Sequence, residues 1–191
     1  MNTGLFFGSF NPIHIGHLAI ANYMLEFGNI DEIWLIVSPH NPLKKEETLM
    51  DENERLKMVE MALNNDLKIK PSAIEFNLPR PSYTIDTLNY LSGKYPNKQY
   101  KIILGTDNFK SIHQWKNYNE ILTNYDILVY PRAGYDIGGY ENYPNISLVD
   151  APLMEISSSF IRKSLKNKKN VKYFLPYGIY DYINKNHLYE K

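Results

Sequence analysis

The chain of 191 residues contains no cysteine. That absence excludes disulfide bonds, thiol catalysis and cysteine-ligated metal sites, and it suits a reducing compartment. Neither sign of charge is in excess, because Lys plus Arg and Asp plus Glu both number 21. A neutral chain has no bulk field that attracts nucleic acid or an anionic membrane, so local groups must hold any anion that binds.

Long apolar runs are absent as well. No stretch reaches the roughly 20 apolar residues that a membrane-spanning helix needs, and the opening residues MNTGLFFGSF lack the basic segment of a signal peptide. We therefore expect a cytoplasmic protein with no membrane partner and no nucleic-acid partner. The length predicts one domain over residues 1–191. The composition leaves open whether the chain forms a homo-oligomer.

Short strand-like apolar runs alternate with longer helical stretches along the chain. Strands are predicted at GLFF (4–7), EIWLIVS (32–38), 68–76, KIILG (101–105), DILVY (126–130) and 146–149. Helices are predicted at 15–27, behind a capping box formed by Asp51 and Glu54, after Pro81, around Trp115 and Ile121, at 157–166 and at 176–186. This alternation predicts an α/β fold, Rossmann-like and doubly wound, with a mostly parallel sheet and helices on both faces. In such a sheet, ligands bind beyond the carboxyl ends of the strands.

The loop GSFNPIHIGH (8–17) joins the first predicted strand to the first predicted helix. Gly8 lets the backbone approach a ligand closely, and Ser9 adds a hydroxyl and an N–H. The helix start presents free N–H groups and the positive end of its dipole. His14 and His17 lie on one face of the first turn. Together these groups favour a phosphate site.

Two other interpretations of this loop compete with the phosphate site. One is a structural turn in which the two histidines cap or pack locally. The other is a zinc site, but helical zinc pairs are usually spaced i, i+4 and need a third ligand. Only His40, His113 and His187 remain to provide that ligand, so we expect no metal held by the protein itself.

Two further segments carry cations beside polar groups. SPHNPLK (38–44) leaves the second strand at the same sheet edge as the first loop, which makes Lys44 either a polyphosphate ligand or a solvated lysine. In ISSSFIR (156–162), Ser157 can cap a helix. Arg162 falls in or near the first turn, where a cation opposes the helix dipole. An anion at this helix end would remove that conflict; the alternative is that Arg162 points into water.

Polar and aromatic residues follow other predicted strands. LGTDNF places Gly105 and Asp107 just past the fourth strand. RPSYTIDTL (80–88) puts Ser82, Tyr83 and Thr84 at a helix start, where backbone N–H groups can receive a carboxylate. Trp115 either stacks on a heteroaromatic ring or packs in the core between short helices.

The motif GSFNPIHIGHL resembles the phosphate-binding signature of the nucleotidyltransferase superfamily, whose His-Ile-Gly-His core class I aminoacyl-tRNA synthetases share. The order GSFNPIHIGHL, SPHNPLK, PSYTIDTL, LGTDNF, the Trp115 segment, YPRAG and ISSSFIR resembles the bacterial nicotinate-mononucleotide adenylyltransferases over nearly the whole chain. The resemblance implies the nucleotidyltransferase fold, with residues 151–191 completing an ATP site. Asn11 stands where that family usually has Asp, and Phe7 replaces a common first glycine.

The resemblance also implies partners and site residues. ATP and nicotinate mononucleotide would react to deamido-NAD and pyrophosphate, with Mg²⁺ carried in by the nucleotide. The implied catalytic set is His14, His17, Lys44 and Arg162. The implied ATP-binding set is Gly8, Ser9, Phe10, Gly105, Asp107, Ile156, Ser157 and Ser158. The implied substrate-binding set is Tyr83, Thr84, Trp115 and Arg132.

This reaction needs no general base, because a phosphate monoester has a second pKa of about 6 and is mostly dianionic at neutral pH. The absence of an evident carboxylate pair or Ser-His-Asp set is consistent with it. Rival readings are the same chemistry on nicotinamide mononucleotide or phosphopantetheine, and a nucleotide-binding regulatory module without turnover. A synthetase-like RNA-binding protein is disfavoured, because the chain is neutral and has no basic stripe.

Overall fold

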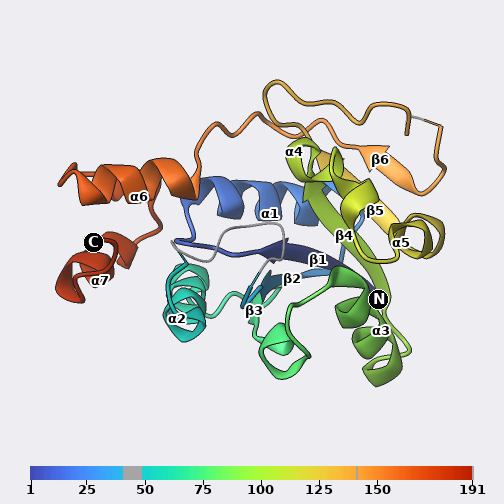
Figure 1. Cartoon of the computed structure of the whole chain (residues 1–191), viewed down its shortest axis with the longest axis horizontal. Helices are drawn as coiled ribbons and strands as arrows, with labels where there is room; N and C mark the ends of the chain where they lie inside the picture. Colours follow the sequence, from blue (N-terminus) through green and yellow to red (C-terminus); the bar gives the residue numbers. More distant parts are fainter. Residues whose placement is uncertain (41–48, 141, 191) are drawn as a thin grey trace.

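The computed structural model describes residues 1–40, 49–140 and 142–190. Its centre is a six-stranded sheet in the order β3-β2-β1-β4-β5-β6 (Figure 1), and every neighbouring pair of these strands is parallel. The strands are β1 (Asn2–Gly8), β2 (Glu32–Val37), β3 (Ile69–Ser72), β4 (Gln99–Gly105), β5 (Asp126–Tyr130) and β6 (Ile146–Leu148). The predicted α/β fold with a parallel sheet is confirmed.

Helices occupy the connections between the strands. The α-helices are α1 (Ile15–Phe27), α2 (Glu52–Leu63), α3 (Thr84–Lys94), α4 (Thr106–Phe109), α5 (Tyr118–Asn124), α6 (Ser158–Lys166) and α7 (Ile179–Lys185). Short 3-10 turns are η2 (Ile74–Asn77), η3 (Ile112–Gln114) and η4 (Lys172–Phe174). None of the helices that the structure describes is long and apolar enough to span a bilayer.

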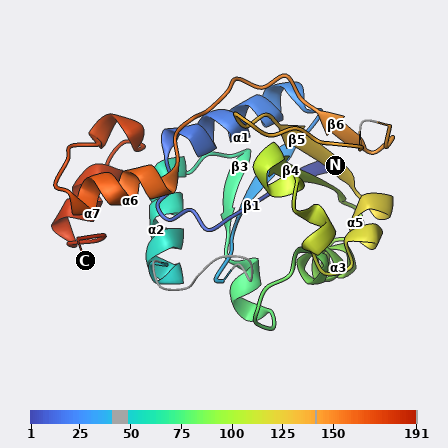
Figure 2. The ribbon, with the colours of Figure 1, turned by 45° about the horizontal axis from the view of Figure 1, so that its top comes forward.

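The sheet separates two hydrophobic cores. Adjacent residues of a strand point to opposite faces, so Leu5 and Phe6 of β1 are both buried but belong to different cores. The core around Phe6 includes side chains from α1, α2, α6 and α7, whereas the core around Leu5 includes side chains from α3, α4 and α5. Figures 1 and 2 both show α6 and α7 beside α2, at one end of the molecule. The C-terminal segment is therefore packed onto the same layer as α1.

The strand order reverses between β1 and β4. The chain builds outward from β1 to β2 and β3, then returns to place β4 on the other side of β1. A crevice forms beyond the carboxyl ends of the strands at such a reversal, because the two flanking connections leave in opposite directions. The loop after Gly8 and the segment after Gly105 both begin at this point.

Three local predictions differ from the structure. The strand predicted at 68–76 ends at Ser72, and η2 follows it. β3 lies at the sheet edge and contains Pro71, which lacks the N–H that would extend the ladder. Asp51 caps α2 as predicted, but the expected return partner Glu54 instead accepts a hydrogen bond from the Tyr182 hydroxyl at 2.8 Å. The helix predicted at 176–186 begins only at Ile179.

Candidate active site

Two adjoining cavities lie at the carboxyl edge of the sheet, and they share part of their walls. The first has a volume of about 450 Å³ and is lined by residues of the first loop, the end of β4, the end of β5 and the start of α6. The second has a volume of about 550 Å³ and is lined by residues of the first loop, η2, the start of α3 and the segment around η3. The residues common to both linings are Phe7, Gly8, Ser9, Leu104 and Asn108.

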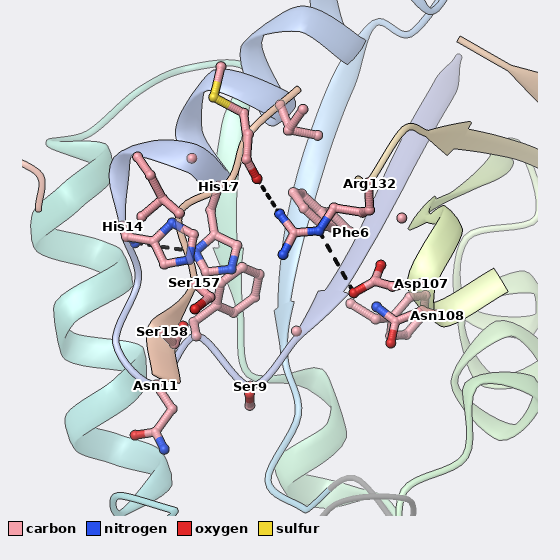
Figure 3. Close-up of a pocket in the computed structure, with 18 of the residues that line it drawn as sticks. Phe6, Ser9, Asn11, His14, His17, Asp107, Asn108, Arg132, Ser157 and Ser158 are labelled. Atoms are coloured by element: carbon pink, nitrogen blue, oxygen red, sulfur yellow. Dashed lines mark hydrogen bonds and ion pairs between the residues drawn. The ribbon is translucent and has the colours of Figure 1, made fainter. Parts of the chain in front are cut away.

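The two histidines of the first loop form a stacked pair in the first cavity (Figure 3). Their ring centroids lie 3.6 Å apart with an interplanar angle of 22°. The backbone N–H of His14 donates to Nδ1 of His17 at 3.2 Å. An accepting Nδ1 places the proton of a neutral His17 ring on Nε2. His17 can therefore offer Nε2–H as a hydrogen-bond donor.

His14 is the more buried ring of the pair, with 4% of its surface exposed. Burial, with a smaller contribution from the nearby positive charge of Arg132, lowers the pKa of His14 from 6.5 to about 3. The ring is therefore neutral at pH 7, and Nδ1 has no hydrogen-bond partner among the described residues. Gly16 makes room for the ring, since a Cβ there would lie 3.1 Å from His14 Nδ1.

The start of α6 is bonded to the first loop across a long sequence separation. Ser157 caps α6 as predicted, accepting from Phe160 N at 3.2 Å. Ser158 Oγ donates to Pro12 O at 2.9 Å, and Arg162 Nη1 donates to Asn11 O at 2.7 Å. Arg162 therefore points toward the first cavity, not into open solvent.

The side chain of Asn11, which stands where the family usually has Asp, is hydrogen-bonded to other parts of the chain. Its Oδ1 accepts hydrogen bonds from the Tyr189 hydroxyl at 2.8 Å and from Met50 N at 3.4 Å. Only 3% of Asn11 is exposed. The uncharged amide thus joins the first loop to the end of the chain, and a neutral hydrogen bond is sufficient for that link.

Arg132 lies in the first cavity, although the resemblance grouped it with the acceptor residues. Its guanidinium donates to Met154 O and lies 3.8 Å from the carboxylate of Asp107, as Figure 3 shows. The Arg132 N–H also donates to Thr106 Oγ1 at 2.8 Å. A Cβ at position 105 would collide with Asp107 Oδ1, so a residue larger than Gly105 would force the Asp107 side chain to move.

The second cavity contains Tyr83, Thr84 and Trp115, the other three residues that were expected at the acceptor end. Tyr83 is the N-cap of α3 and makes no side-chain capping hydrogen bond. The N–H groups of the first turn of a helix have no intrahelical acceptors, so this end of α3 can receive an anion. Lys116 lies over the Tyr83 ring, with Nζ 4.9 Å from the ring centroid.

The structure brings together most of the predicted site. The first cavity is lined by Gly8, Ser9, Phe10, His14, His17, Gly105, Asp107, Ile156, Ser157, Ser158 and Arg162. Lys44 lies outside the described residues. The sequence analysis did not identify Asn108, which lines both cavities, nor Glu75 and Lys116, which line the second.

Arg55 was also not identified from the sequence, although a signal was present. Arg55 stands in α2 three and four residues before Met58 and Val59, so it shares their buried face. A charged residue within an apolar stripe indicates a buried ion with specific partners. Arg55 is wholly buried, and its guanidinium donates to backbone carbonyl oxygens beside the first loop.

This fold and this site define the nucleotidyltransferase class. A family model described as cytidylyltransferase-like matches residues 5–164. A probable nicotinate-nucleotide adenylyltransferase of Flavobacterium johnsoniae is 52% identical, and the match covers 100% of both chains. One of Bacteroides fragilis with the same description is 45% identical over 95% of this chain and 90% of its own. The chain belongs to the nicotinate-nucleotide adenylyltransferase family.

A solved structure supports the fold. The nicotinic acid mononucleotide adenylyltransferase of Plasmodium falciparum, solved in complex with NaAD, has a TM-score of 0.84 against this chain at 24% identity. The match covers 99% of this chain and 97% of that one. This likeness confirms the fold, and the sequence matches confirm the family that the motifs suggested.

Proposed function

We propose that the protein transfers the adenylyl group of ATP to nicotinate mononucleotide, giving deamido-NAD and pyrophosphate. The observation that carries this proposal is the shared wall of the two cavities at Gly8 and Ser9. A nucleotide in each cavity would bring its phosphate to this same loop, which is what a transfer between two phosphates requires. The names of the relatives support the same reaction.

The first cavity suits ATP, and the second suits the acceptor. ATP would lie along Gly105, Asp107, Arg132 and Ile156–Ser158, with its phosphates between the first loop and Arg162. The acceptor would lie with its ring beside Trp115 and its carboxylate at the start of α3, near Tyr83 and Thr84. Its phosphate would reach Gly8 and Ser9.

In the reaction, an oxygen of the acceptor phosphate attacks the α-phosphorus of ATP, and the bond from that phosphorus to the bridging oxygen breaks. The electron pair leaves with pyrophosphate. The protein positions the two anions in line and stabilises the negative charge that develops on the departing oxygens. His17 would donate from Nε2, Arg162 would contribute charge, and the start of α1 would contribute N–H groups.

His14 has a role different from that of a permanent cation. It is neutral in the free site because of the lowered pKa. Phosphate oxygens beside it would stabilise the protonated form, so its pKa rises when ATP binds. Lys44, which lies outside the described residues, is the remaining candidate from the sequence for binding the polyphosphate.

Mg²⁺ is proposed to enter on the nucleotide. Within residues 1–40, 49–140 and 142–190, no three His, Asp or Glu side chains are grouped closely enough to hold a metal ion. Asp107 is the one carboxylate among the described residues of the first cavity, and it lies beside Arg132. Such a site fits Mg²⁺ that is coordinated by phosphates and water. When bound, the ion would neutralise part of the phosphate charge.

An acceptor panel tests the proposal. Pyrophosphate release from ATP is measured with nicotinate mononucleotide, nicotinamide mononucleotide and phosphopantetheine in turn, and products are identified by mass. We expect deamido-NAD, with nicotinate mononucleotide giving the highest kcat/KM. A higher kcat/KM with either other acceptor would reassign the substrate. ATP binding without release of pyrophosphate with any acceptor would indicate a regulatory module instead.

A further inference from the structure

Tyr189 lies near the C-terminal end of the chain, and its hydroxyl reaches the first loop. Tyr189 Oη donates a hydrogen bond to Asn11 Oδ1 at 2.8 Å, over a separation of 178 residues. The Asn11 atom must be the amide oxygen, because Met50 N–H faces the same atom at 3.4 Å and an N–H can only donate. The tyrosine hydroxyl is therefore the donor of this contact.

The backbone at Tyr189 is strained. Its φ is 65°, in the left-handed region that a Cβ disfavours. Leu188 N donates to Ile183 O at 3.0 Å after α7, and the Tyr189 ring packs against the hydrophobic core around Phe6. A strained residue persists only where the surrounding contacts hold it in place. The position of the Tyr189 hydroxyl is therefore set by the fold.

Asn11 also accepts a hydrogen bond from Arg162. Arg162 Nη1 donates to Asn11 O at 2.7 Å, and Nη2 donates to Ser159 Oγ at 3.3 Å. Asn11 thus contacts Tyr189 through its side chain and Arg162 through its backbone carbonyl. Asn11 and Arg162 line the first cavity (Figure 3), and neither is among the described residues that line the second. A change in the orientation of Asn11 would therefore move Arg162 in the first cavity and leave the acceptor cavity unchanged.

We propose that Tyr189 is a positioning residue for ATP binding: its hydroxyl fixes Asn11, and the Asn11 carbonyl in turn orients the Arg162 guanidinium toward the polyphosphate. Tyr189 acts through Asn11, because it is not among the described residues that line either cavity. The inference rests on the proposed function, since it takes ATP to occupy the first cavity. An arginine that is already held in its binding geometry loses less conformational freedom when the ligand binds. Removing the Tyr189 hydroxyl should therefore weaken ATP binding without removing any contact to ATP.

Tyr189→Phe tests the proposal, because it removes the hydroxyl and keeps the ring in the core. The Kd of ATP with Mg²⁺ is measured by calorimetry, and the KM of nicotinate mononucleotide is measured by steady-state kinetics. We expect the Kd to rise about fivefold, which is the effect of one hydrogen bond, while the KM of the acceptor stays within about twofold of the wild-type value. A loss of general stability would not divide the two nucleotides in this way.

Tyr182→Phe is the matched control. The Tyr182 hydroxyl also comes from the C-terminal segment and donates at 2.8 Å, but its acceptor is Glu54 Oε2 of α2 and not the first loop. We expect this variant to keep the Kd of ATP within about twofold of the wild-type value. Equal increases in the Kd of the two variants would indicate a general loosening of the C-terminal segment. That result, or an unchanged Kd in Tyr189→Phe, would overturn the proposal.

Two further backgrounds test the path through Asn11. Asn11→Ala lacks the acceptor, so adding Tyr189→Phe should change the Kd by less than about twofold. Asn11→Asp keeps an acceptor oxygen, so adding Tyr189→Phe should raise the Kd about as much as it does in the wild type. An undiminished effect of Tyr189→Phe in Asn11→Ala would overturn the proposal. A wild type that binds ATP but releases no pyrophosphate with any acceptor would refute the proposed function alone, because the Kd values do not depend on turnover.

Discussion

The guanidinium of Arg55 donates a hydrogen bond from Nη1 to the carbonyl oxygen of Ser9 at 2.7 Å, although the two residues are 46 positions apart. The same Nη1 donates to Ser38 O at 2.7 Å, and Nη2 donates to Pro39 O at 3.0 Å. Nε donates to Met50 O at 2.8 Å. One buried cation thus joins the loop after β1 to the segment after β2, and it contacts Ser9, one of the five residues that both cavities share.

Arg55→Lys is expected to destabilise the protein and to slow turnover. A lysine ammonium has three donors on one atom and cannot reach four carbonyl oxygens that are arranged for a planar guanidinium. We expect a loss of about 2–4 kcal/mol in the free energy of unfolding, measured in urea, because buried carbonyls lose their donors. Arg80→Lys is the control, since Arg80 is exposed and pairs with Glu52 at the surface. Equal stability in the two variants would contradict this role.

His17→Ala is expected to lower kcat at least 100-fold while the fold survives. Removing one donor to a developing oxyanion typically costs about 10²–10³ in rate, and Nε2 of His17 is the donor assigned here. Steady-state kinetics with saturating ATP and acceptor measure the effect, and circular dichroism checks the fold. His113→Ala, at an exposed position of η3, is the matched control. Near-normal turnover by a folded His17→Ala would remove His17 from the mechanism.

Gly16→Ala is expected to lower the activity while leaving the stability of the fold nearly unchanged. Its new Cβ would lie 3.1 Å from His14 Nδ1, so the imidazole must shift. The same change favours the helix by about 0.5–1 kcal/mol. We expect kcat to fall by about 10-fold or more, with the free energy of unfolding changed by less than about 1 kcal/mol.

Gly93→Ala provides the comparison for that variant. A Cβ on Gly93 of α3 meets nothing within 4 Å, so it should gain the helix stabilisation and keep the wild-type kcat. If both alanine variants keep full activity, the position of the His14 ring does not limit the reaction.

Glu32 is expected to make the stability depend on pH in acid. Burial alone would raise the pKa of Glu32, but Lys70 at 2.7 Å and Lys98 outweigh it and lower the value from 4.5 to about 2. A carboxyl with a depressed pKa stabilises the fold above about pH 4.5 and loses that contribution as the pH falls toward 2.

The measurement for Glu32 is urea unfolding at pH 6 and pH 3. The wild type should lose about 1–3 kcal/mol more than Glu32→Gln over this interval, after allowing for the partial exposure of Lys70. Glu26→Gln, at an exposed position of α1, should follow the wild type. A parallel decline of wild type and Glu32→Gln would show that the lysine pairs contribute little.

Much of the fold could be predicted because its signals are local. The apolar runs at 32–38 and 101–105 correspond to β2 and β4, and Ser157 caps α6 as its position before the helix indicates. The prediction of a strand at 68–76 is wrong beyond Ser72, because η2 follows there. Hydrophobic periodicity is a local signal and does not report contacts with distant segments. Each success depends on neighbours within a few residues.

The candidate site also has one part that could be predicted from the sequence and another part that could not. The first loop is contiguous, so its glycine, hydroxyl and histidines could be recognised together. Arg55 carries a charge that usually faces water, and only its burial against distant segments shows its importance. Arg132 was expected near the acceptor, and its place beside Asp107 follows from the pairing of β4 with β5.

The amino-acid sequence by itself determined the alternation of strands and helices, the parallel sheet and the loop of glycine, serine and histidines after the first strand. Hydrophobic periodicity, capping and turn chemistry act over one or two turns of chain, so these features can be recognised without coordinates. Only the tertiary structure decided that His14 is neutral, that Arg55 joins two loops, and which cavity each polar group enters. Burial, protonation and the distance between groups depend on segments that are far apart in the sequence and come together only in the fold. The sequence alone therefore does not give them.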